Sequence, residues 1–220
     1  MHSTTLVRVL LLSLAVAVGC FEIVSAAAEL TSSKRPDFPE DPTKASLSSN
    51  AAPEWVGMIS PLRSDLEGNQ ALLLALQVMQ LPRGDNRVRA QSELARSGLK
   101  HVVSISPYDA ELWLALAVLE ARQDPEGPAA IESLKMVYLT APSEGRLMPL
   151  RLASATRFDA LASPDVRDLV QGDVRLMLTR EPKQTRALVL AYRQASARGK
   201  EFLKDAIRAI DPALLNVLGG

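Results

Sequence analysis

The sequence predicts an all-α protein built from antiparallel helix pairs stacked along one axis, with a separate apolar segment at the N-terminus. The motif Ala-x3-Leu-x2-Val-x4-Pro occurs at residues 95–107 and again at 130–142, 35 residues later, and a looser copy covers residues 170–182. Self-similarity at such a period is typical of stacked helical arrays. Ala and Leu dominate and aromatic residues make up only 4% of the chain, which favours helix over sheet.

An export signal is predicted at residues 1–28. Arg8 precedes an uncharged apolar run at residues 9–21, Glu22 ends that run, and small residues follow at 25–28. This order is typical of a secretory signal peptide. As a helix the run spans roughly 20 Å, short of the roughly 30 Å hydrocarbon core, which favours cleavage over the alternative of an uncleaved membrane anchor. Either way Arg8 stays in the cytoplasm, so we expect an extracytoplasmic body.

Cys20 is the only cysteine, so no intramolecular disulfide is possible. Residues 17–20, Ala-Val-Gly-Cys, resemble a bacterial lipobox, whose cysteine is lipidated after cleavage. The interpretation that we favour is a small hydrophobic residue within the apolar run. The Ala- and Arg-rich composition indicates a bacterial source with a GC-rich genome, so the compartment outside the cytoplasm is expected to be the periplasm.

Residues 29–53 are rich in Pro, Ser and charge and show no apolar period, which predicts a disordered tether with an r.m.s. reach of roughly 25–30 Å. Residues 54–65 include Trp55, Val56, Met58 and Ile59, and are expected to cap the exposed face of the first repeat. A frayed tail is expected at residues 216–220.

Four helix pairs are predicted in the body, residues 66–215. They cover residues 66–80 and 87–105, 110–122 and 129–139, 143–161 and 164–178, and 185–197 and 200–210. Pro107 ends the second helix, and Asp109 is placed to cap the third. Ser163 caps the helix that starts at residue 164, and Gly199 separates the last two helices. Pro149 either kinks its helix or marks a later start.

The helix at residues 110–122 is apolar on every face between its two glutamates, Glu111 and Glu120. Such a helix must be covered all round. The glutamates leave too short an apolar span for a membrane crossing. We therefore expect this helix to lie centrally between neighbouring pairs.

The spacing of the second pair resembles the tetratricopeptide repeat (TPR). Trp113 and Ala117 occupy the family's large and small positions in the first helix, and Ala130, Leu134 and Pro142 occupy those in the second. The other pairs match the family pattern less closely. The resemblance implies a short right-handed solenoid over residues 66–215, with Trp113 buried between consecutive repeats. The alternative fold is a generic α-helical bundle.

The family's arrays bind other proteins through a concave groove lined by the first helix of each pair. The resemblance implies that the groove-lining side chains are Glu111, Leu114, Val118, Arg122, Arg146, Arg157, Arg186 and Arg193. Its arginines would suit an acidic peptide or an anionic glycan, because guanidinium groups pair bidentately with carboxylates. The alternative interpretation is that these arginines are ordinary solvated residues.

No catalytic motif, metal site or cofactor site is predicted, and balanced charge argues against a nucleic-acid partner. We expect an exported, non-enzymatic scaffold that binds a protein partner, for example in envelope or polysaccharide assembly, with membrane contact through the N-terminal segment if that segment is uncleaved. The alternative is a glycan-cleaving enzyme on a helical scaffold, for which Glu111 and Glu120 are the candidate carboxylates.

Overall fold

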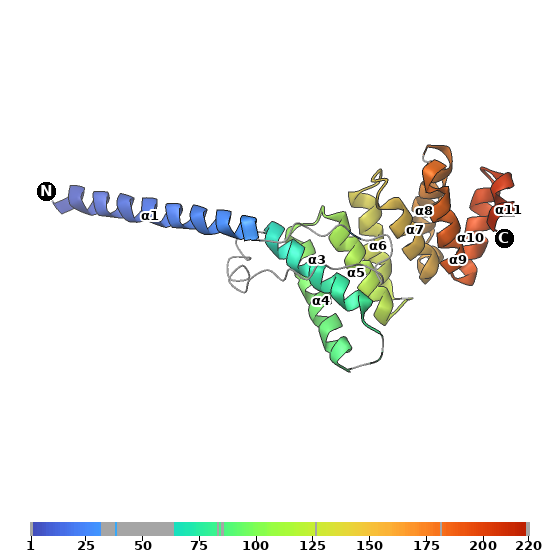
Figure 1. Ribbon diagram of the computed structural model, residues 1–220, viewed down its shortest axis with the longest axis horizontal. Helices are drawn as coiled ribbons and strands as arrows, with labels where there is room; N and C mark the ends of the chain where they lie inside the picture. The colour runs from blue at the N-terminus through green and yellow to red at the C-terminus, as the bar shows by residue number, and fades with distance from the viewer. Residues whose placement is uncertain are drawn as a thin grey trace.

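The computed structural model describes residues 2–31, 38, 64–82, 84, 86–125, 127–180 and 182–218. All regular secondary structure in these ranges is helical, which confirms the predicted fold class at this level (Figure 1). From α3 onward the helices follow one another in chain order along the long axis of the molecule (Figure 1).

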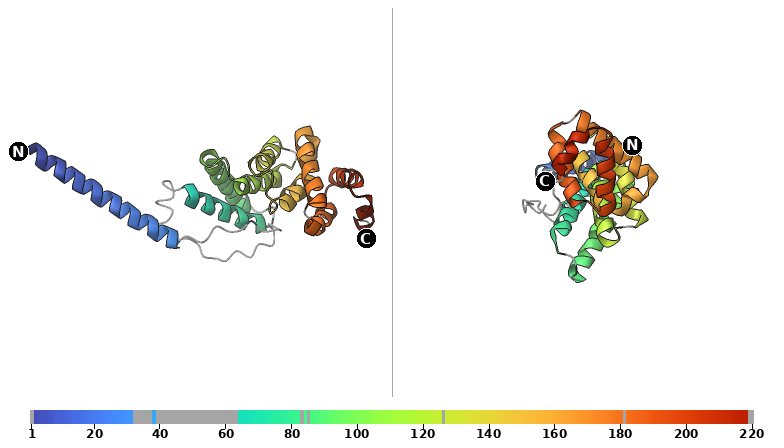
Figure 2. Two further views of the ribbon diagram at one scale, coloured as in Figure 1. Left: turned by 90° about the horizontal axis from the view of Figure 1, so that it is seen from above. Right: turned by 90° about the vertical axis from the view of Figure 1, so that its right-hand side faces the viewer.

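The N-terminal helix α1 (His2–Thr31) extends away from the body as a straight rod in both side views (Figures 1 and 2). Its segment Val7–Ala27 has a mean hydropathy of 2.3 and is not buried against the rest of the protein. By length and composition it is able to cross a membrane, and a signal sequence has the same properties. Residues 29–31, placed in the tether by the sequence, form the last turn of this helix. The cap residues 54–63 and the tether, apart from residues 29–31 and Phe38, lie outside the described residues.

The body begins at Ser64. Its helices are α3 (Ser64–Gln80), α4 (Asn86–Ile105), α5 (Ala110–Gln123), α6 (Pro128–Thr140), α7 (Met148–Arg157), α8 (Pro164–Thr179), α9 (Thr185–Gln194), α10 (Ala197–Arg208) and α11 (Leu215–Leu218), with short 3-10 turns at Asp159–Ala162, Pro182–Gln184 and Pro212–Leu214. The first four body helices lie within two residues of the predicted ranges. Local signals explain this agreement: Asp109 caps α5 by accepting hydrogen bonds from the N–H groups of Glu111 and Leu112, at 3.1 and 3.3 Å.

Local predictions at α7, at α8 and in the C-terminal tail are corrected. Helix α7 starts at Met148 rather than at residue 143, with Pro149 in its first turn, where proline loses no intrahelical hydrogen bond. Ser163 precedes α8 as predicted, but its side chain makes no capping hydrogen bond. The predicted frayed tail is wrong at Leu218, which is buried in the core at the end of α11.

Gly199 does not separate the last two helices but lies in the first turn of α10, which is capped by Ser196. A Cβ atom at Gly199 would overlap the backbone carbonyl of Thr156 at the end of α7, with the carbonyl carbon at only 2.9 Å. Ser196 fixes this approach, because its N–H and its Oγ both donate to Thr156 O, at 3.0 and 3.1 Å. Glycine is therefore needed for close packing between α7 and α10.

Helices α3 and α5 pack side by side and run in the same direction. Gly68 near the start of α3 lies against Leu112 near the start of α5. At the other end, Arg122 of α5 donates to the carbonyls of Val78 in the last turn of α3 and of Leu81 just after it, at 3.0 and 2.7 Å.

Helices α7 and α9 repeat this arrangement. Gln184 donates to Gly145 O at 3.0 Å where the two helices begin, and Arg157 hydrogen-bonds to Gln194 where they end. An ion pair between Glu111 and Arg146 links the starts of α5 and α7. Helices α3, α5, α7 and α9 therefore all begin on the same side of the body.

The predicted burial of α5 is confirmed over most of its surface. It packs on α3, α4 and α6, and both Leu112 and Leu119 on one face and Leu114 on the opposite face are fully buried. The sequence predicted that Trp113 is buried between consecutive repeats, and this prediction is wrong. Its indole is half-buried, with Nε1 donating to Pro107 O at 2.8 Å, because the start of α5 faces an open groove between α4 and α6.

Candidate functional site

The exposed residues that we call the arginine face are Arg186, Leu190 and Arg193 of α9, Arg157 at the end of α7 and Arg146 in the turn before α7. Arg186 and Arg193 are seven residues apart on α9 and share one side of it, with Leu190 between them. Because α7 and α9 begin and end together, Arg146 lies at the Arg186 end of the face and Arg157 at the Arg193 end.

The arginines of this face differ in how they are held. Arg146 pairs with the buried Glu111, and Arg157 bonds to Gln194. Within the described ranges, Arg186 and Arg193 are exposed and make neither an ion pair nor a hydrogen bond. Leu190 is 53% exposed, comparable with Leu94 and Leu139 of other body helices at 63% and 65%. The face therefore combines two available guanidinium groups with an uncovered apolar side chain.

The remaining predicted groove residues, all on α5, do not form an open surface. Leu114 is fully buried, so its placement in a groove is wrong. Val118 is half-buried and packs against the core. Arg122 donates to the carbonyl of Val78 at the end of α3 and to that of Leu81 just after it, where carbonyls have no partner within the helix. Arg122 and Arg157 lie one 35-residue period apart, and each reaches from the end of its own helix to the end of a neighbour.

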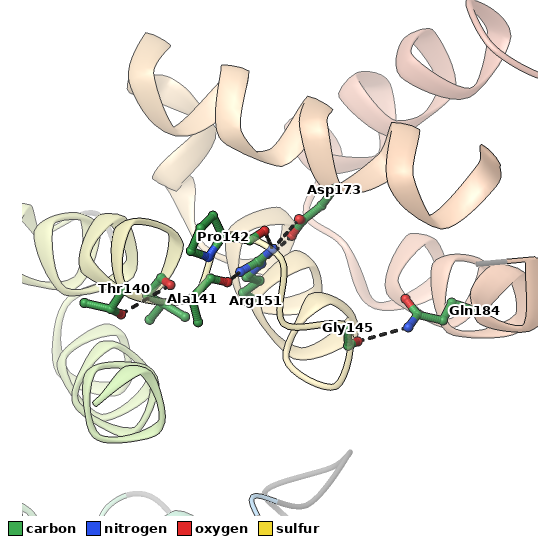
Figure 3. Close-up of polar contacts among 8 residues, drawn as sticks. Thr140, Ala141, Pro142, Gly145, Arg151, Asp173 and Gln184 are labelled. Atoms are coloured by element: carbon green, nitrogen blue, oxygen red, sulfur yellow. Dashed lines mark hydrogen bonds and ion pairs between the residues drawn. The ribbon is translucent and has the colours of Figure 1, made fainter. Parts of the chain in front are cut away.

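A buried ion pair that sequence analysis did not identify joins α7 to α8 (Figure 3). Arg151 donates through Nε and Nη2 to the two carboxylate oxygens of Asp173, at 2.6 and 2.5 Å. Its Nη2 also donates to Pro142 O at 2.9 Å, its Nη1 donates to Ala141 O, and its guanidinium lies 4.5 Å from the centre of the Tyr138 ring. One arginine thus holds the end of α6 and the middle of α8.

Burial dominates the electrostatics of this cluster. It raises the pKa of the Asp173 carboxyl above its usual value, although the hydrogen bonds and the charge of Arg151 oppose the rise. It also raises the pKa of Tyr138 well above the usual value, and the charge of Asp173 adds to the effect. The sequence does carry a signal for the pair: Arg151 shares a helix face with Met148 and Ala155, and Asp173 shares one with Val170 and Met177. A charge on a buried face needs a partner.

A second surface feature lies between α4 and α6, with α5 as its floor. It is an open, mostly apolar groove of about 400 Å³, lined by Lys100, Val103, Ser104, Trp113, Leu116, Glu120, Ala129, Glu132, Ser133 and Met136. The groove predicted from the sequence lies on the first helices of the pairs, and the groove between α4 and α6 was not predicted. The width of the groove depends on the distance between α4 and α6. The residue pattern of a single helix does not specify that distance.

The two candidate catalytic carboxylates are buried and ion-paired at opposite ends of α5. Glu111 pairs with Arg146. Glu120 pairs with Arg96 and Lys100 of α4, at 2.9 and 2.8 Å. Both carboxylates thus connect neighbouring segments of the body. Among the described residues, no group of His, Cys, Asp and Glu is arranged to hold a metal ion.

Comparison with protein-family models, with curated proteins and with solved structures finds no match to this chain.

Proposed function

We propose that this protein is an exported, TPR-like helical scaffold that binds a protein partner through the arginine face. The observation that carries the proposal is the pair of uncommitted arginines, Arg186 and Arg193, on either side of the exposed Leu190. The parallel course of α3, α5, α7 and α9, and the contact between Glu111 and Arg146 one period apart, support a short solenoid of antiparallel helix pairs, whose right hand is what the TPR resemblance implies.

The chemistry of the face favours an acidic protein segment with one large apolar side chain. Residues 143–218 contain 13 Arg and Lys against 9 Asp and Glu, a balance of +4, whereas residues 64–142 contain 7 against 10, a balance of −3. Opposite charge on the partner would speed the encounter and fix its register, while contact with Leu190 would bury apolar surface. The setting that we propose is the bacterial cell envelope, for example polysaccharide assembly.

The first prediction concerns the two free arginines. Replacing both, Arg186→Gln with Arg193→Gln, should weaken partner binding by about tenfold or more and reduce its salt dependence, because charge-assisted contacts are lost. Stability should change by less than about 0.5 kcal/mol, since both residues are exposed. The measurement is affinity for a protein retained from envelope extract by the immobilised full-length chain and then purified.

The matched control is Arg167→Gln with Arg175→Gln, which removes two exposed arginines from α8 and changes the net charge equally. This control should bind as wild type does. Equal weakening in both double variants would show that net charge, rather than the arginine face, governs binding. Unchanged binding in the α9 variant would refute the proposed site.

The second prediction concerns export. A reporter enzyme that is active only outside the cytoplasm should be active when fused after Gly220, because Arg8 favours the cytoplasmic side and the apolar helix follows it. Mass spectrometry of the mature N-terminus distinguishes cleavage near Ala26 from an intact anchor and from a lipidated Cys20. Activity from a cytoplasmic reporter alone would contradict export.

A further inference from the structure

Phe38 is buried although it lies inside the stretch that composition marks as a tether. It is 5% exposed and belongs to the same cluster of buried side chains as the core residues of the body. In the sequence it is the only aromatic residue between positions 29 and 53, and prolines stand at positions 36 and 39. An isolated aromatic residue in a polar stretch gains free energy by leaving water, and here the body supplies the apolar surroundings.

We infer that the helical body carries a binding site for a phenylalanine side chain, and that this chain's own Phe38 occupies it. The inference goes beyond the proposed partner surface, because it needs neither Arg186 nor Arg193. The neighbouring prolines favour such docking, since proline has fewer backbone conformations to lose when the segment is fixed.

The consequence is a much shorter connection between α1 and the body. Seven Cα steps separate Thr31, the last residue of α1, from Phe38, so the two lie at most about 25 Å apart. Without the Phe38 attachment, 33 steps separate Thr31 from Ser64, and a fully extended chain would reach about 115 Å. Docking of Phe38 therefore holds the body close to the end of the apolar helix, and hence close to a membrane that contains this helix.

The test compares full-length variants by limited trypsin digestion followed by mass spectrometry. Phe38→Ala should raise the cleavage rate after Lys34 and Lys44 by tenfold or more, because the segment loses its attachment. Phe38→Leu, which keeps a large apolar side chain, should stay close to wild type. Phe21→Ala is the matched control, because it truncates an exposed phenylalanine of α1 and should leave these rates unchanged.

Two outcomes overturn the inference. The first is an unchanged cleavage rate in Phe38→Ala. The second is an equal rise after Arg167 and Arg175 of α8, which would make Phe38 a fold-determining core residue rather than the occupant of a separable site.

A peptide of residues 32–44, added at about 1 mM to match the effective concentration of a short tether, provides an independent readout. It should bind Phe38→Ala at least tenfold more tightly than wild type, whose site is filled. The same peptide with Ala in place of Phe38 should bind neither chain. Equal binding to both chains would also overturn the inference.

Discussion

Replacing Asp173 by Ala should lower the free energy of unfolding by about 3–5 kcal/mol, because it leaves the buried guanidinium of Arg151 without its counter-charge. The carbonyls of Ala141 and Pro142 would still accept hydrogen bonds from Arg151, but neither carries a formal charge. The measurement is urea denaturation of the purified full-length protein, followed by circular dichroism.

Two control variants distinguish the cost of an unpaired buried charge from the cost of losing an ion pair as such. Asp165→Ala removes the partner of Lys135 at 3.0 Å, but Asp165 is 71% exposed, so we expect a cost below about 1 kcal/mol. The double variant Arg151→Met with Asp173→Leu should be more stable than Asp173→Ala, because no unpaired charge stays buried. A cost below about 1 kcal/mol for Asp173→Ala would mean that water reaches the pair, in conflict with its burial.

Gly199→Ala should destabilise the protein by about 1–3 kcal/mol or more, because the added methyl group must displace the end of α7 from the start of α10. Glycine at this point loses conformational entropy on folding, yet alanine is expected to be worse. The measurement is the thermal unfolding midpoint, together with near-ultraviolet circular dichroism to detect altered packing.

Gly172→Ala is the matched control, with an expected effect of opposite sign. Gly172 is exposed within α8 and has no neighbouring atom within 4 Å of an added Cβ. Alanine should therefore stabilise this helix by about 0.5–1 kcal/mol. If both substitutions stabilise the protein, the close approach of Gly199 to Thr156 is not present in solution.

The sequence by itself determined the helical fold class and most helix ends. Asp109 marks the start of α5, and Pro107 follows the end of α4 by two residues. These signals act within a few residues, through hydrogen bonds that helix N–H groups donate to one carboxylate or through one proline ring that cannot continue a helix. The apolar side chains around α5 likewise required packing neighbours on every side, but they did not specify which segments supply them.

The tertiary structure alone decided which residues on those helices are available for binding. In the sequence, Gly199 resembles a residue that separates two helices. In the structure it lies against the backbone of Thr156, 43 residues earlier in the chain, and this close contact requires glycine. Leu114 and Leu190 are both leucines on first helices of their pairs, yet one is fully buried and the other 53% exposed. Arg122 and Arg186 are both arginines of the predicted groove, but only Arg122 holds the end of a neighbouring helix. The ends of a helix depend on adjacent residues, so the sequence was sufficient to locate them. The exposure and the pairing of a side chain depend on contacts between segments that are distant in the chain, so only the packing of the helices decided which residues form the surface.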